Sequence, residues 1–231
     1  MYLSNIQILG HELMFILRQT KLLMIFKLLQ NISRRMAIFY HGTSVLFDHF
    51  DMSHLSEGDG KCKFGVGEYA TSVYSTAALY AGKGSNPTYY VYTIEVPDLT
   101  EDNHIFSARR VSPGIVKRTE GQLGAIPDEV KSAGKLFRKY VGNLLIGNIG
   151  TEKRMSGSLS IEGEIAATNF FSSIGVLFLV WPNAQTAPDN GEINVAVLRD
   201  DVIRIVKIET VELDSKGKYV NGSNRTVKQY E

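Results

Sequence analysis

One histidine and two tyrosines in this sequence are placed where they could act on a ligand. His41 follows an apolar strand pattern and precedes Gly42, so its imidazole could bond a ligand hydroxyl while the glycine lets backbone groups approach closely. Tyr69 lies in a glycine-rich turn and Tyr80 follows eleven residues later, so their flat rings could hold a heteroaromatic group. The alternatives are a structural histidine in a turn and two aromatic core residues.

Several common catalytic motifs are absent from the sequence. Gly65-Val66-Gly67 begins like a dinucleotide-binding fingerprint, but the third glycine is missing and the segment follows a loop pattern. There is no P-loop lysine, nucleophile elbow or HExxH pattern, and no Cys/His cluster has zinc-ligand spacing, so we expect no metal site. The single cysteine, Cys62, excludes an internal disulfide and suits a reducing, cytoplasmic compartment.

The elements expected to position these residues are mixed α and β. Strands are predicted over 37–40, 88–96, 176–181, 193–198 and 203–208, and helices over 73–81, 128–145 and 161–174. For the first helix we expect Ser72 as the N-cap and Gly82 as the C-cap. Because strands open and close the pattern around central helices, the sequence predicts an α+β domain rather than a doubly wound sheet.

The charged residues are unevenly distributed along the chain. The 231 residues carry a formal net charge of only +1, but residues 107–154 hold ten basic against four acidic residues. A basic insert on an otherwise acidic body is typical of a surface that binds a polyanion such as nucleic acid. The alternative is a solvated helix face that binds nothing.

Residues 1–35 differ from the rest of the chain. Their longest uninterrupted apolar run is five residues, far short of the roughly 20 that span a bilayer, and no signal-peptide pattern is present. We expect a helical extension that packs on the body or binds a partner, and no transmembrane segment. A membrane-surface helix is a second alternative, and an internal start at Met36 is a third. Residues 36–231 would then form the domain.

Three parts of the sequence together resemble the NAD-dependent ADP-ribosyltransferase superfamily. They are Phe39-Tyr-His-Gly-Thr-Ser44, then Gly65-Val-Gly-Glu-Tyr-Ala-Thr71 with Ala77-Ala-Leu-Tyr-Ala81, then Phe170 to Pro182 with Asn194 to Ile205. Their order and spacing, over about residues 37–210, are closest to the His-Tyr-Glu branch shared by diphtheria-toxin-like and poly(ADP-ribose) polymerase domains. The resemblance implies a split β-sheet core with helices packed around it.

The resemblance also implies roles for residues at matching positions. His41 would hydrogen-bond the adenosine ribose of NAD, and the backbone of Gly42 would hold the nicotinamide carboxamide, with Thr43 beside it in the NAD-binding set. Tyr69 and Tyr80 would lie on the two sides of the nicotinamide ring.

The family's third residue, usually Glu, is replaced in this chain. Asn194 occupies that position, and Glu192 lies two residues earlier, where a strand places it on the same face. An Asn offers a hydrogen bond but no charge to an oxocarbenium-like centre. Either Glu192 serves, or Asn194 serves with altered chemistry, or the domain is catalytically weakened. Glu162 and Glu164 are expected to interact with a helix dipole and are only distant candidates.

The function implied by the resemblance is mono-ADP-ribosyl transfer from NAD, the co-substrate, to a nucleic acid such as RNA or to a protein. A toxin, toxin–antitoxin or phage-defence role, with an antitoxin or other protein partner, is expected by analogy alone. One alternative is a catalytically inactive NAD- or partner-binding module with the same fold. Another is a partner- or membrane-associated protein whose activity depends on residues 1–35.

Overall fold

The computed structural model describes residues 35–52, 64–84, 86–148, 159–184 and 191–230. The chain divides into two units, Met1–Met36 and Ala37–Glu231, and every described helix belongs to the second. The helical extension expected over 1–35 lies, except for Arg35, outside the described residues, and so does Cys62. None of the described helices combines the length and apolar character needed to cross a membrane.

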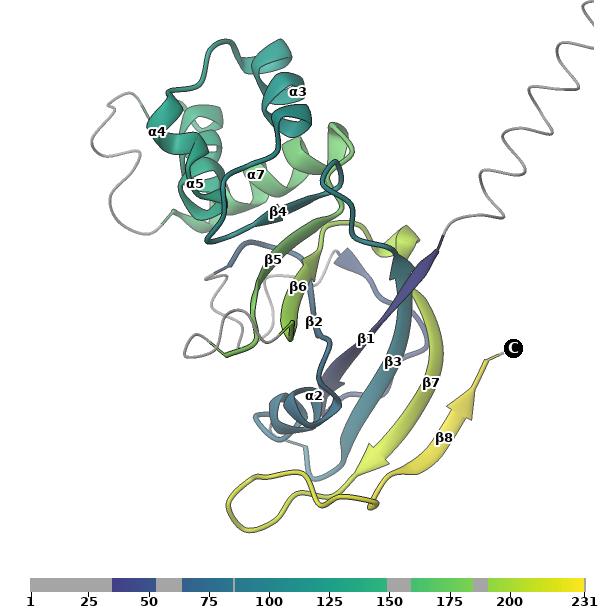
Figure 1. Ribbon diagram of the computed structural model, residues 1–231. Coiled ribbons are helices and arrows are strands. Elements are labelled where there is room, and N and C mark those ends of the chain that lie inside the picture. Colours follow the sequence, from purple (N-terminus) through teal and green to yellow (C-terminus); the bar gives the residue numbers. More distant parts are fainter. Residues whose placement is uncertain (1–34, 53–63, 85, 149–158, 185–190, 231) are drawn as a thin grey trace, which may run out of the picture. The chain divides into compact units, whose positions relative to one another are not determined.

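Eight strands form one mixed sheet in the order β4-β5-β6-β2-β1-β3-β7-β8, which confirms the α+β class (Figure 1). The strands are β1 Met36–Thr43, β2 Glu68–Thr71, β3 Tyr89–Pro97, β4 His104–Phe106, β5 Phe178–Pro182, β6 Ile193–Val197, β7 Arg204–Val211 and β8 Arg225–Gln229. The β4–β5 pair is parallel, and the pairs β5–β6, β6–β2, β2–β1, β3–β7 and β7–β8 are antiparallel.

The sheet has two halves that meet at a narrow seam. In the described register, the strands β2 and β1 are joined by one residue pair, Tyr40 opposite Thr71. Both halves contribute to one buried cluster, in which Val195 of β6 packs with Tyr92 of β3 and Ile208 of β7. The sheet therefore bends at the seam and buries the same face of both halves, which we call the inner face.

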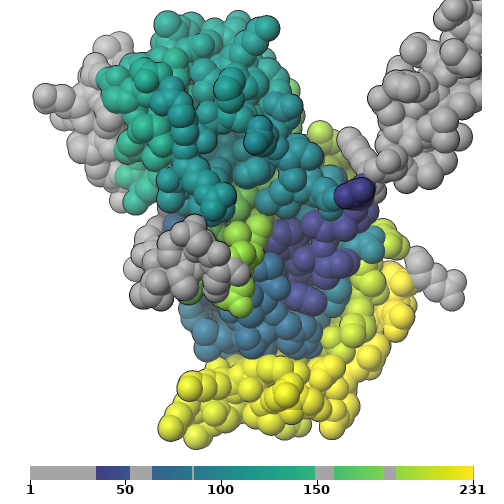
Figure 2. Space-filling model, in the orientation of Figure 1, coloured from purple at the N-terminus to yellow at the C-terminus, as the bar shows by residue number. Residues whose placement is uncertain are grey.

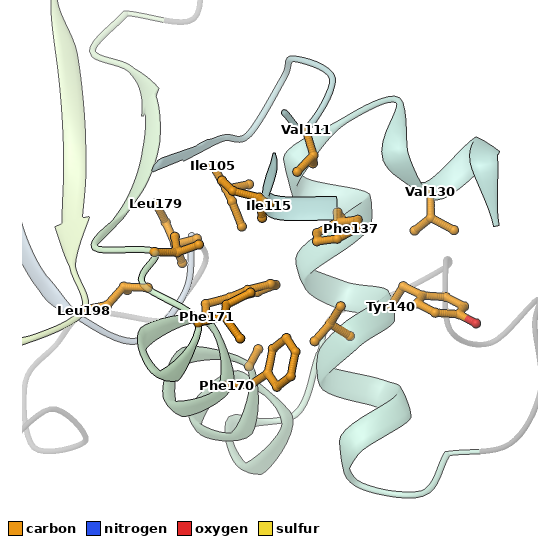
Figure 3. Close-up of a cluster of buried hydrophobic side chains, with 14 of the residues drawn as sticks. Ile105, Val111, Ile115, Val130, Phe137, Tyr140, Phe170, Phe171, Leu179 and Leu198 are labelled. Atoms are coloured by element: carbon orange, nitrogen blue, oxygen red, sulfur yellow. The ribbon is translucent and has the colours of Figure 1, made fainter. Parts of the chain in front are cut away.

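The helices cover the other, outer face of the sheet. Helix α2 (Tyr74–Ala81) packs Ala77 and Ala78 against Val91 of β3. The helices α3 (Pro113–Leu123), α4 (Asp128–Lys131), α5 (Gly134–Leu145) and α7 (Ile161–Ser173) gather near β4 and β5. Figure 3 shows their core, where Phe137 of α5 and Phe171 of α7 lie near Leu179 of β5.

The single helix predicted over 128–145 is wrong, because the chain forms two helices with Ser132 and Ala133 between them. The backbone at this break pairs with the segment after β4: Gly134 N donates to Arg109 O at 2.9 Å. A side chain at Gly134 would place its Cβ 2.4 Å from the Phe106 carbonyl oxygen, so the close approach requires glycine.

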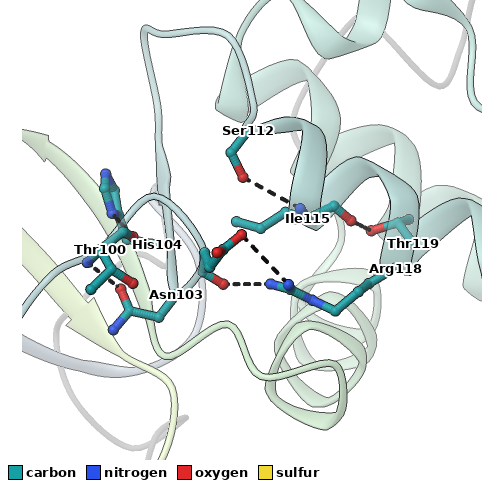
Figure 4. Close-up of polar contacts among 8 residues, drawn as sticks. Thr100, Asn103, His104, Ser112, Ile115, Arg118 and Thr119 are labelled. Atoms are coloured by element: carbon teal, nitrogen blue, oxygen red, sulfur yellow. Dashed lines mark hydrogen bonds and ion pairs between the residues drawn. The ribbon is translucent and has the colours of Figure 1, made fainter.

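Helix α3 is absent from the sequence prediction, although its start carries a normal signal. The hydroxyl of Ser112 accepts a hydrogen bond from Ile115 N at 3.3 Å, and Pro113 occupies the first turn (Figure 4). Arg118 binds the carboxylate of Asp102, which ties the helix to the β3–β4 connection. Two glycines within the helix weaken its intrinsic propensity, so tertiary contacts stabilise it.

Strand β4, of three residues, and strand β8, whose residues are all exposed, also fall outside the predicted strands. The expected N-cap of α2 is wrong as well: Val73 caps that helix without a side-chain hydrogen bond. The Ser72 hydroxyl instead accepts a hydrogen bond from Ile193 N at 2.9 Å, and so joins β6 to the segment before α2. Gly82 ends the helix as expected.

Candidate functional site

Four side chains of the candidate site lie on the outer face of the sheet near the seam. Asn194 of β6 is paired with Thr71 of β2 on one side and with Trp181 of β5 on the other. Directly opposed residues of antiparallel strands point to the same face, and Tyr69 lies two residues from Thr71 on β2. These four residues form what we call the site floor.

Asn194 is the most informative member of the site floor. Only 7% of the residue is exposed. Its carboxamide forms no hydrogen bond with any described residue, and its polar atoms keep contact with solvent. A carboxamide that reaches solvent is hydrated, and a ligand group that displaces this water can bond to the same donor and acceptor atoms. The unpaired amide is therefore available to a polar ligand group on the site floor.

The ring of Tyr69 is held in position by two contacts. Its hydroxyl donates a hydrogen bond to Gly65 O at 2.7 Å, and its ring meets Trp181 edge-on with centroids 5.2 Å apart. The ring of Phe64 stacks on Trp181 with centroids 4.4 Å apart. Tyr69 is thus part of an ordered aromatic wall, and its partner residues were not singled out by sequence.

Helix α2 is anchored at the seam by the close approach of Gly42. A Cβ at Gly42 would lie 1.7 Å from the carbonyl oxygen of Ala77, a distance that no side chain can tolerate. Gly42 is therefore needed to seat α2 against β1. This packing role is separate from the contact between the Gly42 backbone and a ligand, which stays a prediction.

Glu192 lies beside α2 at the edge of the site floor. Its Oε2 accepts a hydrogen bond from Asn183 Nδ2 at 3.4 Å, and the same Nδ2 donates to Thr76 Oγ1 at 3.3 Å. Tyr80 follows Thr76 by four residues, so the two share one face of α2. Tyr80 is 51% exposed, and Lys83 Nζ lies 4.0 Å from its ring centroid. The structure thus places Glu192 and the face of α2 that carries Tyr80 at the same edge of the site floor.

His41 lies within β1 rather than in a turn, and its side chain points to the inner face. Its ring packs edge-on against Phe47, Phe50 and Tyr92, with centroids 5.2–6.1 Å apart. The Nδ1 atom lies 2.7 Å from the carbonyl oxygen of Tyr69, and burial lowers the pKa of the imidazole. A neutral ring that donates through Nδ1 leaves Nε2 as an acceptor for a hydroxyl.

The sequence-predicted residues therefore divide between two faces. Tyr69 and Asn194 belong to the outer face, and His41 contacts this group through the backbone of Tyr69. Thr43 ends β1, and its hydroxyl accepts a hydrogen bond from Val45 N at 3.1 Å. The rings of Tyr69 and Tyr80 contact different neighbours: Tyr69 meets Trp181, and Tyr80 meets Lys83. The described ring contacts therefore do not join the two tyrosines that the resemblance places on either side of the nicotinamide.

The expected role of Glu164 needs correction, although Glu162 and Glu164 do lie in the first turn of α7. Glu164 is buried and pairs with the buried Arg138 of α5, so it bridges two helices rather than serving the helix dipole alone. This pair also removes one charge from the basic insert. Other basic residues there are paired with acidic residues as well, namely Arg110, Arg118 and Lys131.

Residues that sequence reasoning missed are Thr71, Thr76, Trp181 and Asn183. Trp181 lies in a predicted strand, but its position opposite Asn194 depends on a register that the sequence does not supply. In the described part of the chain, no group of three or more His, Cys, Asp or Glu side chains is placed to hold a metal ion. Comparison of the chain with protein-family models, curated proteins and solved structures finds no match.

Proposed function

We propose that residues 36–231 form an NAD-dependent mono-ADP-ribosyltransferase, as the sequence resemblance over about residues 37–210 implies. In this reaction the bond between C1′ of the nicotinamide ribose and the pyridinium nitrogen breaks, and nicotinamide leaves with the bonding electron pair. A nucleophile of a macromolecular acceptor then bonds to C1′ and loses its proton. The bent sheet, with helices on its outer face, is compatible with the split core that the resemblance implies.

The observation that carries the proposal is the unpaired carboxamide of Asn194 on the site floor, beside Tyr69. In the proposed complex it hydrogen-bonds a hydroxyl of the nicotinamide ribose. Tyr69 lies on the same face, so its exposed edge and Tyr80 of α2 are the surfaces proposed to receive the nicotinamide ring. His41 lies on the inner face, so in this proposal it acts through its hydrogen bond to the carbonyl of Tyr69, which positions β2.

Glu192 is assigned the electrostatic role that Asn194 cannot fill. It lies two residues before Asn194, at the edge of the floor, and its carboxylate is oriented by Asn183. A preorganised negative group stabilises the positive charge that develops at C1′, and loss of such a group typically lowers kcat by about 100- to 1,000-fold. The position of this carboxylate is thus the sharpest test of the proposal.

The test measures nicotinamide release and transfer of labelled ADP-ribose by the full chain, with cellular RNA, DNA or protein as the acceptor. We expect Glu192→Gln to lower kcat by about 100-fold or more and Asn194→Ala to lower it less. The matched control is Glu212→Gln, which removes the same charge from an exposed position outside the site and leaves the rate unchanged.

Two outcomes would contradict the enzyme proposal. If the wild type consumes no NAD with any acceptor and does not bind NAD by calorimetry, the site assignment is wrong. If it binds NAD with an affinity that depends on Tyr69 but never turns it over, the inactive NAD-binding module is correct instead. Equal rates for Glu192→Gln and Glu212→Gln would remove Glu192 from the mechanism.

A further inference from the structure

An open polar pocket lies on the outer face of the half of the sheet that contains β1, β3, β7 and β8. It is an open hollow of about 840 Å³ between the start of α2, strand β7 and the segment before β8. Three tyrosines line it: the rings of Tyr40 and Tyr74 meet edge-on with centroids 5.2 Å apart, and Tyr74 and Tyr219 lie 5.4 Å apart. Sequence reasoning assigned no role to these residues.

The base of this pocket is held rigid by Glu209, which is 3% exposed. Its carboxylate accepts hydrogen bonds from Tyr74 Oη at 3.1 Å and from Asn224 Nδ2 at 2.8 Å, and it pairs with Lys207 Nζ at 3.0 Å. Burial alone would raise the pKa of Glu209, but the bonds from Asn224 and Lys207 lower it, so the group stays ionised. The charges of Glu209 and Lys207 offset one another, which leaves a pocket for an uncharged group.

Three polar side chains of the pocket remain available to a ligand. Tyr40, Asn221 and Gln229 line it, and their side chains form no hydrogen bond with any described residue. Aromatic rings beside free amide and hydroxyl groups suit a flat ligand that carries donors and acceptors on its edge, as a nucleobase does.

The surroundings of the pocket are basic. Residues 204–230 hold six basic and three acidic side chains, a balance of +3. Lys216 and Lys218, in the turn before β8, lack a carboxylate partner among the described residues. Arg225 and Lys228 of β8 are paired with Thr210 and Ile208, which point to the inner face, so they do not face the pocket. Figure 2 shows this segment in yellow, on the opposite side of the strands from the teal helices of the basic insert.

We infer that this pocket binds one unstacked base of a single-stranded nucleic acid while Lys216 and Lys218 contact its phosphates. Stacking on aromatic rings combined with a basic track is how proteins bind single strands. A duplex does not fit this description, because its bases are paired and stacked. The inference names the acceptor class of the proposed transferase and in that respect rests on the proposed function.

Helix α2 connects the pocket with the candidate NAD site. Tyr74 and Ser75 line the pocket, and the next residue, Thr76, belongs to the hydrogen-bonded group that includes Asn183 and Glu192. A strand held in the pocket thus lies next to the helix that flanks the proposed site of C1′ chemistry.

The test is fluorescence anisotropy of the full chain with labelled 12-nucleotide RNA and DNA single strands and the matching duplex, without NAD. We expect single strands to bind more tightly than the duplex, with RNA and DNA compared to show whether the 2′-hydroxyl matters. Tyr40→Leu keeps apolar bulk but removes the ring, and it should weaken binding about 5- to 150-fold.

The charge contribution is tested by Lys216→Ala/Lys218→Ala, which should reduce the slope of log affinity against log salt by about 1.4. Lys117→Ala/Lys135→Ala is the matched control, because both lysines are exposed in the basic insert. Circular dichroism confirms that each variant is folded.

Absence of binding to any single strand, or a preference for the duplex, would overturn the inference. A loss of affinity in the Lys117/Lys135 control but not in the Lys216/Lys218 variant would also overturn it. That result would show that residues 107–154 bind the nucleic acid. Because the assay contains no NAD, it measures nucleic-acid binding independently of NAD turnover. If the chain binds single strands but transfers no ADP-ribose, the proposed function is wrong and the binding inference still holds.

Discussion

Replacement of Glu68 by glutamine tests a carboxyl group whose ionised form is disfavoured by its surroundings in the folded chain. Glu68 begins β2, next to Tyr69, and is paired with Val197 of β6. Burial, followed by the negative charges of Asp200 and Asp51, raises the pKa of Glu68 from 4.5 to about 7. Its protonated form is therefore favoured in the folded state at mildly acidic pH.

The size and sign of the effect follow from this shift. A change from 4.5 to about 7 corresponds to about 3 kcal/mol between the two protonation states. Because the pKa is raised on folding, the folded chain binds more protons than the unfolded chain between these values. The stabilisation is complete below pH 4.5 and is lost as the pH rises through about 7.

Urea unfolding of wild type and Glu68→Gln at constant ionic strength measures this difference. We expect the two chains to be similarly stable near pH 4 and the variant to be more stable by up to about 3 kcal/mol at pH 8. Glu212→Gln, at an exposed position, should show no such pH-dependent gain. A stability difference that stays constant with pH, or grows toward acid, would refute the reasoning.

Three further substitutions test the packing around the site. Gly42→Ala should lower the free energy of unfolding by about 1–3 kcal/mol in urea unfolding, because its Cβ would lie 1.7 Å from Ala77 O; an unchanged midpoint would contradict that contact. Arg138→Met should cost about 3–5 kcal/mol by leaving the buried carboxylate of Glu164 unpaired, and the double variant with Glu164→Leu should recover most of that loss. Ser160→Ala should cost about 1 kcal/mol in thermal unfolding, because it removes the bond from Gly163 N, and an equal melting temperature would argue against the cap.

Local patterns predicted the long elements well, because their side chains carry the information within a few residues. The helix expected over 161–174 forms as α7, and the strand expected over 88–96 forms as β3. The break between α4 and α5 escaped prediction, because it depends on backbone bonds to the segment after β4, which is distant in sequence. The three-residue strand β4 has too few residues to show a period, so its pairing with β5 defines it.

The sequence by itself determined the types and order of the candidate residues, the α+β class and the excess of basic residues in the insert. The tertiary structure alone decided which of these residues meet. His41 and Tyr40 are neighbours in the chain, yet the pleat of β1 directs the first to the inner face and the second to the outer face. Asn194 lies opposite Thr71 and Trp181 only through the register of three strands, and Arg138 of the insert pairs with Glu164 of another helix. Composition cannot reveal such pairings, because long-range contacts rather than local spacing set both register and ion pairing.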